Sequence, residues 1–539
     1  MTISENTKGV QIIAYSSTDT SRSNPLGSVT ANISPAACPR GANDGATCPV
    51  SLESPPDPAG VDFVVTTYDM VPNGSGNIPA AANQLGWGAS LGNVFTAGNP
   101  PPTINLTLSS VLARIGMALT PSSLHTLIPS TATIGVYGLD ADSDVIVSNG
   151  FMDANGNALS IGISLDNPLN GQNGGLSLNP TSLSAPSPRG IRLTYPGGYQ
   201  GNGTTTVTIS ASTGTGINDS VKLTAVDPVF KSISDTNIQT PNTLHGGIVF
   251  DQNGGVYYTT VPGPGGGLSY YSGTGAAVSD HYTPPLGQEL IGGSIASSGP
   301  TLYAVGGTTV ATFSANPSTS YAPLPSQSAA PVSNGSAMVY QATGGALWYA
   351  AGNDLVTFPI NGTPAAFTIG LHESAGIAID TTPAQNVWVV DEANNALYEE
   401  TAGSISGPYG LQAGGVPFDA LANANGLFIT DHGLNPAILK VNPSNPHAAP
   451  QVIAIPNGAV PWYMMPDYQQ AGIVWFDYLI NGNQIGLARM DTNVSPPTFS
   501  MATDPSGPSG SQPGAIGAAS NGLVYMVFEN TQTLVQVTR

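Results

Sequence analysis

A short apolar strand with an aromatic residue at its second position recurs seven times in residues 227–539. The seven copies are Val256-Tyr257-Tyr258, Leu302-Tyr303, Leu347-Trp348-Tyr349, Val387-Trp388-Val389, Leu427-Phe428-Ile429, Val474-Trp475-Phe476 and Val524-Tyr525-Met526. Their aromatic positions are 40 to 50 residues apart. A repeat of this length with β-type composition is typical of a β-propeller, in which each repeat forms one four-stranded blade. The pattern therefore predicts a seven-bladed β-propeller over residues 227–539.

The order of strands within each repeat predicts how the ring closes. A run of small residues, such as AGIAID, precedes a tight polar turn, such as Asn425-Gly426, and the aromatic strand follows as the second strand. The last repeat ends at TLVQVTR, which is a third strand by its place in the repeat. We therefore expect VFKSIS, residues 229–234, to supply the missing outer strand, because closure removes open sheet edges.

The front half of the chain has strand patterns of a different kind. Residues 1–113 alternate short strands such as VDFVVTTYDM with turn-rich segments, which predicts a small β-sandwich. Residues 114–226 contain about seven further strand patterns and favour an immunoglobulin-like β-sandwich. The boundary with the repeats falls near Asp227-Pro228. The whole chain is therefore expected to be all-β, with two β-sandwich domains before the propeller.

Composition and charge exclude several classes of partner. The chain has 66 Gly and 47 Pro among 539 residues, which suits many turns between strands. Its 11 Lys and Arg against 32 Asp and Glu give a net charge of −21. Without a basic patch the protein cannot neutralise phosphates, so nucleic acid and anionic membranes are excluded as partners. No apolar run reaches about 18 residues, so we expect no membrane insertion.

The two cysteines indicate the compartment. Cys38 and Cys48 flank a polar loop of nine residues, which favours a local disulfide in an oxidising compartment, the alternative being two free thiols. We therefore expect an exported bacterial protein that is extracellular or at the cell surface. The segment MTISENTKGVQ lacks the basic and apolar regions of a signal peptide, so the export signal is expected to lie outside this chain.

The repeats AGIAIDTTPAQNVWVVDEANNALYEE and DALANANGLFITDHGLNPAILKV resemble those of streptogramin (virginiamycin B) lyases and of the related NHL and SMP-30 propellers. The resemblance implies a top-face site in which His and Glu residues hold a divalent metal and one His acts as a base that opens an ester by elimination. The front half is similar to the immunoglobulin-like modules of exported bacterial proteins. The chain departs from the lyase pattern. It has the adjacent pairs Asp391-Glu392 and Asp431-His432, where a lyase has a Glu and a His with one residue between them.

Candidate functional residues stand before first strands and after second strands, because both positions lie on the top face of a propeller. The catalytic candidates are His245, His372 and His432. The ligand-binding candidates are Glu373, Asp391, Glu392, Asp431, Trp462 and Asp477. The alternative is structural, since an acid after the second strand can cap a turn by accepting backbone N–H groups.

Three functions fit these observations. The first is a propeller that binds a small molecule, glycan or protein ligand without catalysis. The second is a metal-assisted lyase or hydrolase at the top face, in which a divalent metal would be the cofactor. The third is a structural component of the cell surface. Fold alone does not separate them, because propellers host enzymes, binding proteins and scaffolds.

Overall fold

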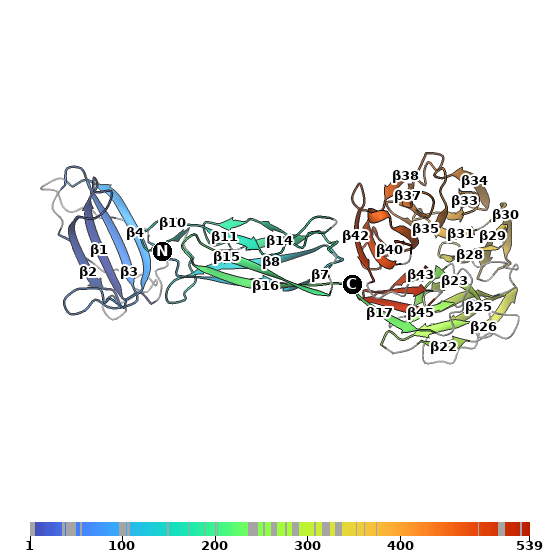
Figure 1. The fold of residues 1–539 in the computed structure, drawn as a ribbon, viewed down its shortest axis with the longest axis horizontal. Coiled ribbons are helices and arrows are strands. Elements are labelled where there is room, and N and C mark those ends of the chain that lie inside the picture. Colours follow the sequence, from blue (N-terminus) through green and yellow to red (C-terminus); the bar gives the residue numbers. More distant parts are fainter. Residues whose placement is uncertain are drawn as a thin grey trace.

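The structure is a computed structural model of the 539-residue chain. It describes residues 6–34, 38, 50–53, 57–95, 104, 108–147, 150–171, 173–187, 189–199, 201, 203–235, 246–251, 254–259, 267–274, 278–282, 290–306, 309–314, 324–328, 337–351, 353–360, 362–372, 374–482, 484–504, 513–528 and 531–538. Three β-structured parts follow one another in a row, in the order of the sequence, with the propeller last (Figure 1). No helix in the described ranges has the length and hydropathy to cross a membrane.

The first part is one antiparallel sheet with strand order β2-β1-β3-β4-β5. Its strands are β1 (Gly9–Ser16), β2 (Pro25–Asn32), β3 (Val61–Tyr68), β4 (Gln84–Asn93) and β5 (Ser109–Ser110). Ala14, Val61 and Phe63 form its small core. The described residues here form this single sheet, so a sandwich over residues 1–113 stays a prediction. Cys38 is buried, and Cys48 lies outside the described residues, so the disulfide also stays a prediction.

The middle part consists of two sheets that pack over one core, with orders β12-β14-β8-β6 and β13-β11-β15-β16-β7, and a short pair β10-β9. Its strands are β6 (Arg114–Thr120), β7 (Ser123–His125), β8 (Ser130–Leu139), β9 (Phe151–Met152), β10 (Ala158–Leu159), β11 (Ile161–Leu165), β12 (Ser177–Asn179), β13 (Ser182–Leu183), β14 (Ile191–Tyr195), β15 (Thr204–Ser212) and β16 (Asn218–Val226). Alternate residues such as Ile134 on β8 and Ile209 on β15 face the shared core, as period-two patterning requires. The immunoglobulin-like assignment of this part stays a prediction.

The third part is a β-propeller, whose described strands form seven sheets. The strands are β17 (Val229–Ser234), β18 (Gly246–Gly247), β19 (Val249–Phe250), β20 (Val256–Thr259), β21 (Leu268–Tyr271), β22 (Ser279–Tyr282), β23 (Leu290–Ser298), β24 (Thr301–Gly306), β25 (Thr309–Ser314), β26 (Leu324–Ser328), β27 (Met338–Gln341), β28 (Ala346–Ala351), β29 (Asp354–Pro359), β30 (Ala365–Thr368), β31 (Ser374–Ile379), β32 (Val387–Asp391), β33 (Ala396–Thr401), β34 (Ser404–Gly410), β35 (Pro417–Asn423), β36 (Gly426–Asp431), β37 (Ala437–Val441), β38 (Gln451–Ala454), β39 (Val460–Pro466), β40 (Ile473–Ile480), β41 (Gln484–Asp491), β42 (Thr498–Thr503), β43 (Pro513–Ala518), β44 (Leu523–Phe528) and β45 (Thr533–Thr538). A 3₁₀ turn, η1 (Pro456–Gly458), precedes β39.

Six of these sheets contain four consecutive strands each, beginning with β19, β23, β27, β31, β35 and β39. Their first strands contact one another in sequence around the ring, so we call them inner strands. The aromatic residues of the second strands, such as Trp388 and Trp475, are fully buried between sheets. This burial explains why the repeat shows an aromatic residue at a fixed place.

The seventh sheet closes the ring. Strand β17 pairs antiparallel with β45 along its whole length, from Val229 opposite Thr538 to Ser234 opposite Thr533. Ile233 on β17 is buried in the core between this sheet and the next. The predicted pairing of VFKSIS with the last strand is therefore confirmed. In the same sheet, the short β18 pairs in parallel with β43.

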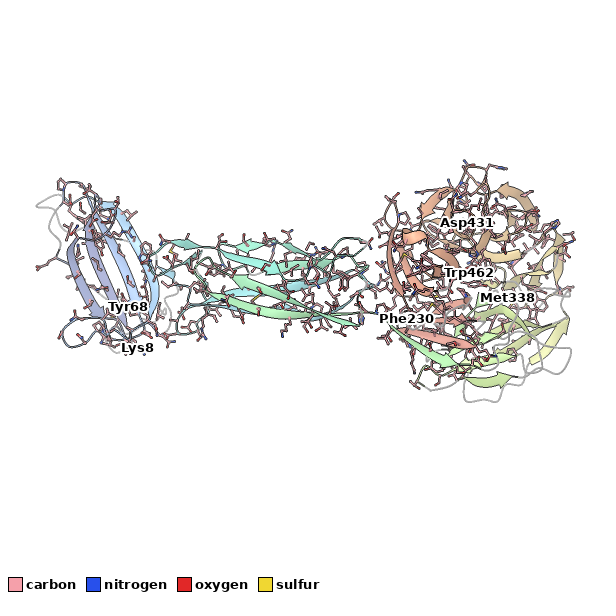
Figure 2. The ribbon with its side chains drawn as sticks, in the orientation of Figure 1. Lys8, Tyr68, Phe230, Met338, Asp431 and Trp462 are labelled. Atoms are coloured by element: carbon pink, nitrogen blue, oxygen red, sulfur yellow. The ribbon has the colours of Figure 1, made fainter. Side chains whose placement is uncertain are left out.

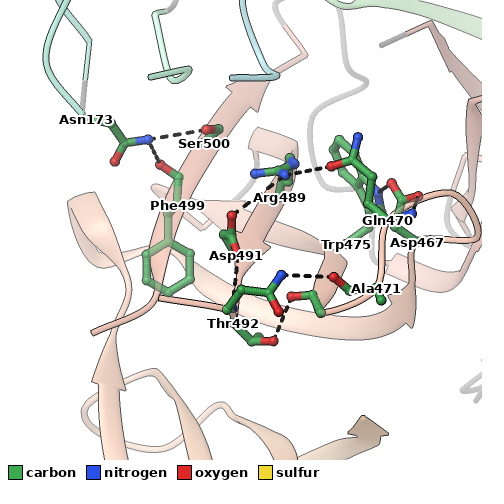
Figure 3. A network of polar contacts seen from close by, with 12 residues as sticks. Asn173, Asp467, Gln470, Ala471, Trp475, Arg489, Asp491, Thr492, Phe499 and Ser500 are labelled. Atoms are coloured by element: carbon green, nitrogen blue, oxygen red, sulfur yellow. Dashed lines mark hydrogen bonds and ion pairs between the residues drawn. The ribbon is translucent and has the colours of Figure 1, made fainter. Parts of the chain in front are cut away.

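The middle part is fixed to the propeller by both polar and apolar contacts. The side-chain amide of Asn173 donates to the carbonyl of Phe499 at 2.5 Å and lies 3.3 Å from the hydroxyl of Ser500, both on β42 (Figure 3). Leu127 is buried in the core formed by the sheets of β39 and β43. These contacts connect the two parts directly.

Candidate functional site

The candidate site lies where β35 and β39 begin, which is the top face of the propeller. Both strands start with a bulge. In β35 the bulge lies between Pro417, which pairs with Asp431, and Ala420, which pairs with Ile429. In β39 the bulge follows Pro461, which pairs with Tyr478. A bulge places extra residues on one strand and turns their side chains away from the regular alternation. Phe418 and Asp419 occupy the first bulge, and Trp462 and Tyr463 occupy the second.

Two buried carboxyl groups meet between these bulges. One oxygen of Asp419 accepts the N–H of Ala420 at 2.8 Å, and the other accepts the N–H of Met464 on the next inner strand at 2.7 Å. One oxygen of Asp477, on β40, accepts the N–H of Tyr463 at 2.7 Å. Thr430 holds the corresponding place on β36, where its hydroxyl accepts the N–H of Asp419 and donates to the carbonyl of Trp462. Asp419 and Thr430 therefore join the two adjacent sheets at the top face, whereas Asp477 holds the bulge of its own sheet.

Burial changes the charge of this carboxyl pair. It raises the pKa of Asp419 to about 7, and the hydrogen bonds from the Met464 and Ala420 amides oppose part of that rise. It raises the pKa of Asp477 to about 8; the Tyr463 amide opposes this rise and the nearby charge of Asp419 adds to it. At neutral pH the pair therefore retains at least one proton and can donate a hydrogen bond.

An aromatic group lies beside the carboxyl pair. The ring of His432 stacks on Phe418 with centroids 4.5 Å apart and lies 4.4 Å from the Trp462 ring. Burial of the imidazole lowers the pKa of His432 to about 4, although a hydrogen bond to the Pro461 backbone opposes this. His432 is therefore neutral at pH 7, and the group offers flat ring faces without a positive charge.

Four buried polar atoms in this region have no hydrogen-bond partner among the described residues. They are Oδ2 of Asp431, Nε2 of His432, Nε1 of Trp462 and Oδ2 of Asp477. Figure 2 labels Asp431 and Trp462, which lie on the two neighbouring sheets. An unpaired buried polar atom costs about 1–3 kcal/mol, so such atoms are scarce in folded proteins. All four lie on or directly after strands of the two sheets that begin with β35 and β39.

The structure separates the residues proposed from the sequence into two groups. Asp391 accepts hydrogen bonds from the backbone of Asn394 and His372 and from the side chain of Asn394, so it caps a turn. Asp431 likewise accepts the N–H groups of Val416 and Gly433 through one oxygen, although its other oxygen is unpaired. These contacts match the structural alternative stated for such acids.

The remaining candidates are distributed unevenly. His432, Trp462 and Asp477 belong to the site just described. His372 is exposed on the preceding sheet and Glu392 is half-buried there. His245 and Glu373 lie outside the described residues, so a convergence of three histidines at one mouth stays a prediction.

Three site residues were missed by the sequence analysis: Phe418, Asp419 and Tyr463. They lie within inner strands, where the regular alternation of side chains predicts residues that pack in the core. The signal that marks them is a proline at the same place in several repeats, Pro417, Pro461 and Pro513, each at the start of a bulge. Proline has no N–H to pair, so it is tolerated where the ladder is interrupted.

The described part of the chain does not gather ligands for a metal ion. No group of three or more His, Cys, Asp or Glu side chains within it is arranged to hold one. The neutral imidazole and the proton-retaining carboxyl pair suit hydrogen bonding with an uncharged group.

Comparisons with known proteins concern the fold. No protein-family model and no curated protein sequence matches the chain. Among solved structures, the chain is similar to virginiamycin B lyase from Staphylococcus aureus, at 16% identity and a TM-score of 0.44, over 58% of this chain and 99% of that chain. It is also similar to YCF48 bound to D1 peptide, at 10% identity and a TM-score of 0.43, over 57% of this chain and 97% of that chain.

A third similar structure is the extracellular domain of a hybrid two-component system from B. thetaiotaomicron, at 15% identity and a TM-score of 0.39, over 57% of this chain and 40% of that chain. The likeness is to a virginiamycin B lyase-like β-propeller as a fold.

Proposed function

We propose that this chain is a binding protein whose propeller takes an uncharged ligand at the top face, between the sheets that begin with β35 and β39. The observation that carries the proposal is the set of four buried, unpartnered polar atoms on Asp431, His432, Trp462 and Asp477. A ligand that pairs with these atoms removes a cost that the free protein bears. No reaction is part of this proposal.

The chemistry of the site selects the class of ligand. Trp462 offers an N–H donor and His432 a ring nitrogen. The unpaired oxygen of Asp431 is an acceptor, and the unpaired oxygen of Asp477 donates when it carries the proton. The rings of His432 and Trp462, which pack on the buried Phe418, supply flat apolar faces, which favour a ligand with a flat, partly apolar face such as a sugar ring. Leu434, two residues after His432, is 90% exposed and provides an apolar contact beside the site. We therefore propose a neutral glycan as the ligand, and a peptide as the alternative.

The test is calorimetric titration of the full chain with three neutral oligosaccharides: cellotriose, maltotriose and triacetylchitotriose. At least one is expected to bind. Trp462→Ala is expected to weaken its binding by at least about tenfold, equivalent to about 1.4 kcal/mol. Trp462→Phe keeps the ring but removes the donor, so we expect a smaller loss.

Tyr468→Ala provides the matched control, because Tyr468 is a 68% exposed aromatic residue just after the end of β39, whereas the site lies at the start of that strand. Its variant is expected to bind like the unaltered chain. Equal losses in both Ala variants, or binding of a neutral peptide in place of every sugar, would argue against the proposed ligand.

We also propose that the chain works outside the bacterial cell, as two β-sandwich domains (1–113 and 114–226) followed by the propeller (227–539). Support comes from the low lysine content and from the loop between Cys38 and Cys48. Immunoblotting of fractionated cells tests the location. Recovery of the protein in the cytosol alone would contradict it.

A further inference from the structure

An open groove of about 620 Å³ lies on the middle part of the molecule, away from the propeller site. Its polar lining consists of Thr131, Thr133, Asn179, Ser187, Arg189 and Arg192. A volume of this size suits a small ligand, because ligand sites commonly measure about 300–1,000 Å³.

The strand register explains why these side chains share one face. Asn179 on β12 pairs with Arg192 on β14, which pairs in turn with Thr133 on β8. Residues directly opposite one another in a sheet project to the same side. The neighbouring residues Ile191 and Leu193 are buried in the core on the other side of the sheet. Asn179, Arg192 and Thr133 therefore form a polar row across three strands.

A tight turn brings the second arginine to this row. The N–H of Gly190 donates to the carbonyl of Ser187 at 3.1 Å, and Gly190 has a φ of +66°. A Cβ at Gly190 would lie 2.6 Å from the carbonyl oxygen of Ile134, so only glycine lets the turn pack this closely on β8. The close packing fixes the start of β14 and holds Arg189 at the groove next to Arg192.

The charge of the groove is opposite to that of the protein. The chain carries a net charge of −21 and only 11 Lys and Arg, yet two Arg line this groove and no Asp or Glu does. Neither guanidinium forms an ion pair or a side-chain hydrogen bond with another described residue. Both side chains are exposed, so their donors are available to a ligand.

We propose that this groove binds an acidic sugar with two carboxylates, of the size of a uronic acid disaccharide. The planar guanidinium groups of Arg189 and Arg192 match carboxylates in two-point hydrogen bonds. Hydroxyl and amide side chains of Thr131, Thr133 and Asn179 match the sugar hydroxyls between them. This site is independent of the propeller site, so a negative result at one site does not affect the proposal for the other.

The experiment is calorimetric titration of the full chain with α-1,4-linked digalacturonate. Its neutral counterpart, galactobiose, and the simple dicarboxylate glutarate are the comparison ligands. Digalacturonate is expected to bind at least about tenfold more tightly than either comparison ligand. Its affinity is expected to fall between about 50 and about 300 mM salt, because salt screens exposed charges. Arg192→Gln and Arg189→Gln are each expected to weaken it at least about fivefold, because each removes a charge-assisted contact.

Arg114→Gln is the matched control, since Arg114 is an exposed arginine on β6 of the same sheet, where it contacts Ser143. It is expected to leave the affinity within about twofold, as a residue away from the contact should. The proposal is overturned if digalacturonate does not bind, if galactobiose or glutarate binds equally well, or if the Arg189 and Arg192 variants bind normally. Tighter binding of an acidic peptide such as hexaglutamate would overturn the sugar as the ligand class.

Discussion

Replacing Asp477 with Asn is expected to stabilise the propeller about 4 kcal/mol more at pH 8 than at pH 5. In the folded chain, burial raises the pKa of Asp477 from 3.8 to about 8. The folded state therefore binds a proton that the unfolded state has released, and stability falls as the pH rises from about 4 towards 8. At 1.36 kcal/mol per pKa unit, this one group costs about 4 kcal/mol between pH 5 and pH 8. The Asn side chain cannot ionise, so the cost disappears.

Asparagine suits this position because only one oxygen of Asp477 is engaged. That oxygen accepts the N–H of Tyr463, and an Asn carbonyl can accept it equally, while the amide group takes the place of the unpaired oxygen. Asp419 is the contrasting case: both of its oxygens accept backbone N–H groups. In Asp419→Asn the amide would face an N–H donor, which is expected to cost about 1–3 kcal/mol even at pH 5.

The assay is urea unfolding at pH 5, 6, 7 and 8, followed by tryptophan fluorescence, since four of the five tryptophans lie in residues 227–539. The free energy of unfolding of the unaltered chain should decline across this range, and that of Asp477→Asn should decline much less. Parallel pH profiles for the two proteins would refute the assignment of a raised pKa to Asp477. A loss at pH 5 as large for Asp477→Asn as for Asp419→Asn would refute the hydrogen-bond geometry.

Three further predictions concern the frame of the protein. Ile233→Ala is expected to lower the free energy of unfolding in urea by about 2–5 kcal/mol and to promote aggregation, because it weakens the closing strand. Val229→Ala, at a 57% exposed position of the same strand, is expected to lower it by less than about 0.5 kcal/mol. Gly376→Ala is expected to lower the free energy of unfolding by about 1–3 kcal/mol, because a Cβ there would lie 2.3 Å from the backbone nitrogen of Ala420. Gly410→Ala is the control, since a Cβ there meets nothing within 4 Å, and an equal loss in both variants would contradict the prediction. Intact mass spectrometry without reductant should show the Cys38–Cys48 bridge as a loss of two hydrogens, and full alkylation of both thiols would exclude it.

Much of the frame follows from local sequence. The repeat of an aromatic residue at 40 to 50 residues predicted strands that the structure places as the second strand of each sheet. The strand at 229–234 was predicted because TLVQVTR stops one strand short of a full repeat, and β17 does pair with β45. These inferences succeed because strand periodicity, turns and repeat length are properties of contiguous residues.

The candidate site was only partly foreseen for the same physical reason. His432, Trp462 and Asp477 were expected from their places at strand ends, whereas Asp419 was not, because its partner Met464 lies 45 residues further along the chain. A bulge in β35 turns Asp419 towards that partner, and burial there raises its pKa. Neither effect leaves a local signature beyond a proline.

The sequence by itself determined the all-β class, the repeats, the closing strand and the acidic charge, since each depends on composition or on the spacing of near neighbours. Only the tertiary structure decided which polar atoms meet. It brings Asp419 near enough to Asp477 for their charges to interact, packs the rings of His432, Phe418 and Trp462 against one another, and aligns Arg192 with Asn179 and Thr133 across three strands. Such contacts depend on register and on the packing of adjacent sheets, which join residues far apart in the chain and also set the burial that changes their charge.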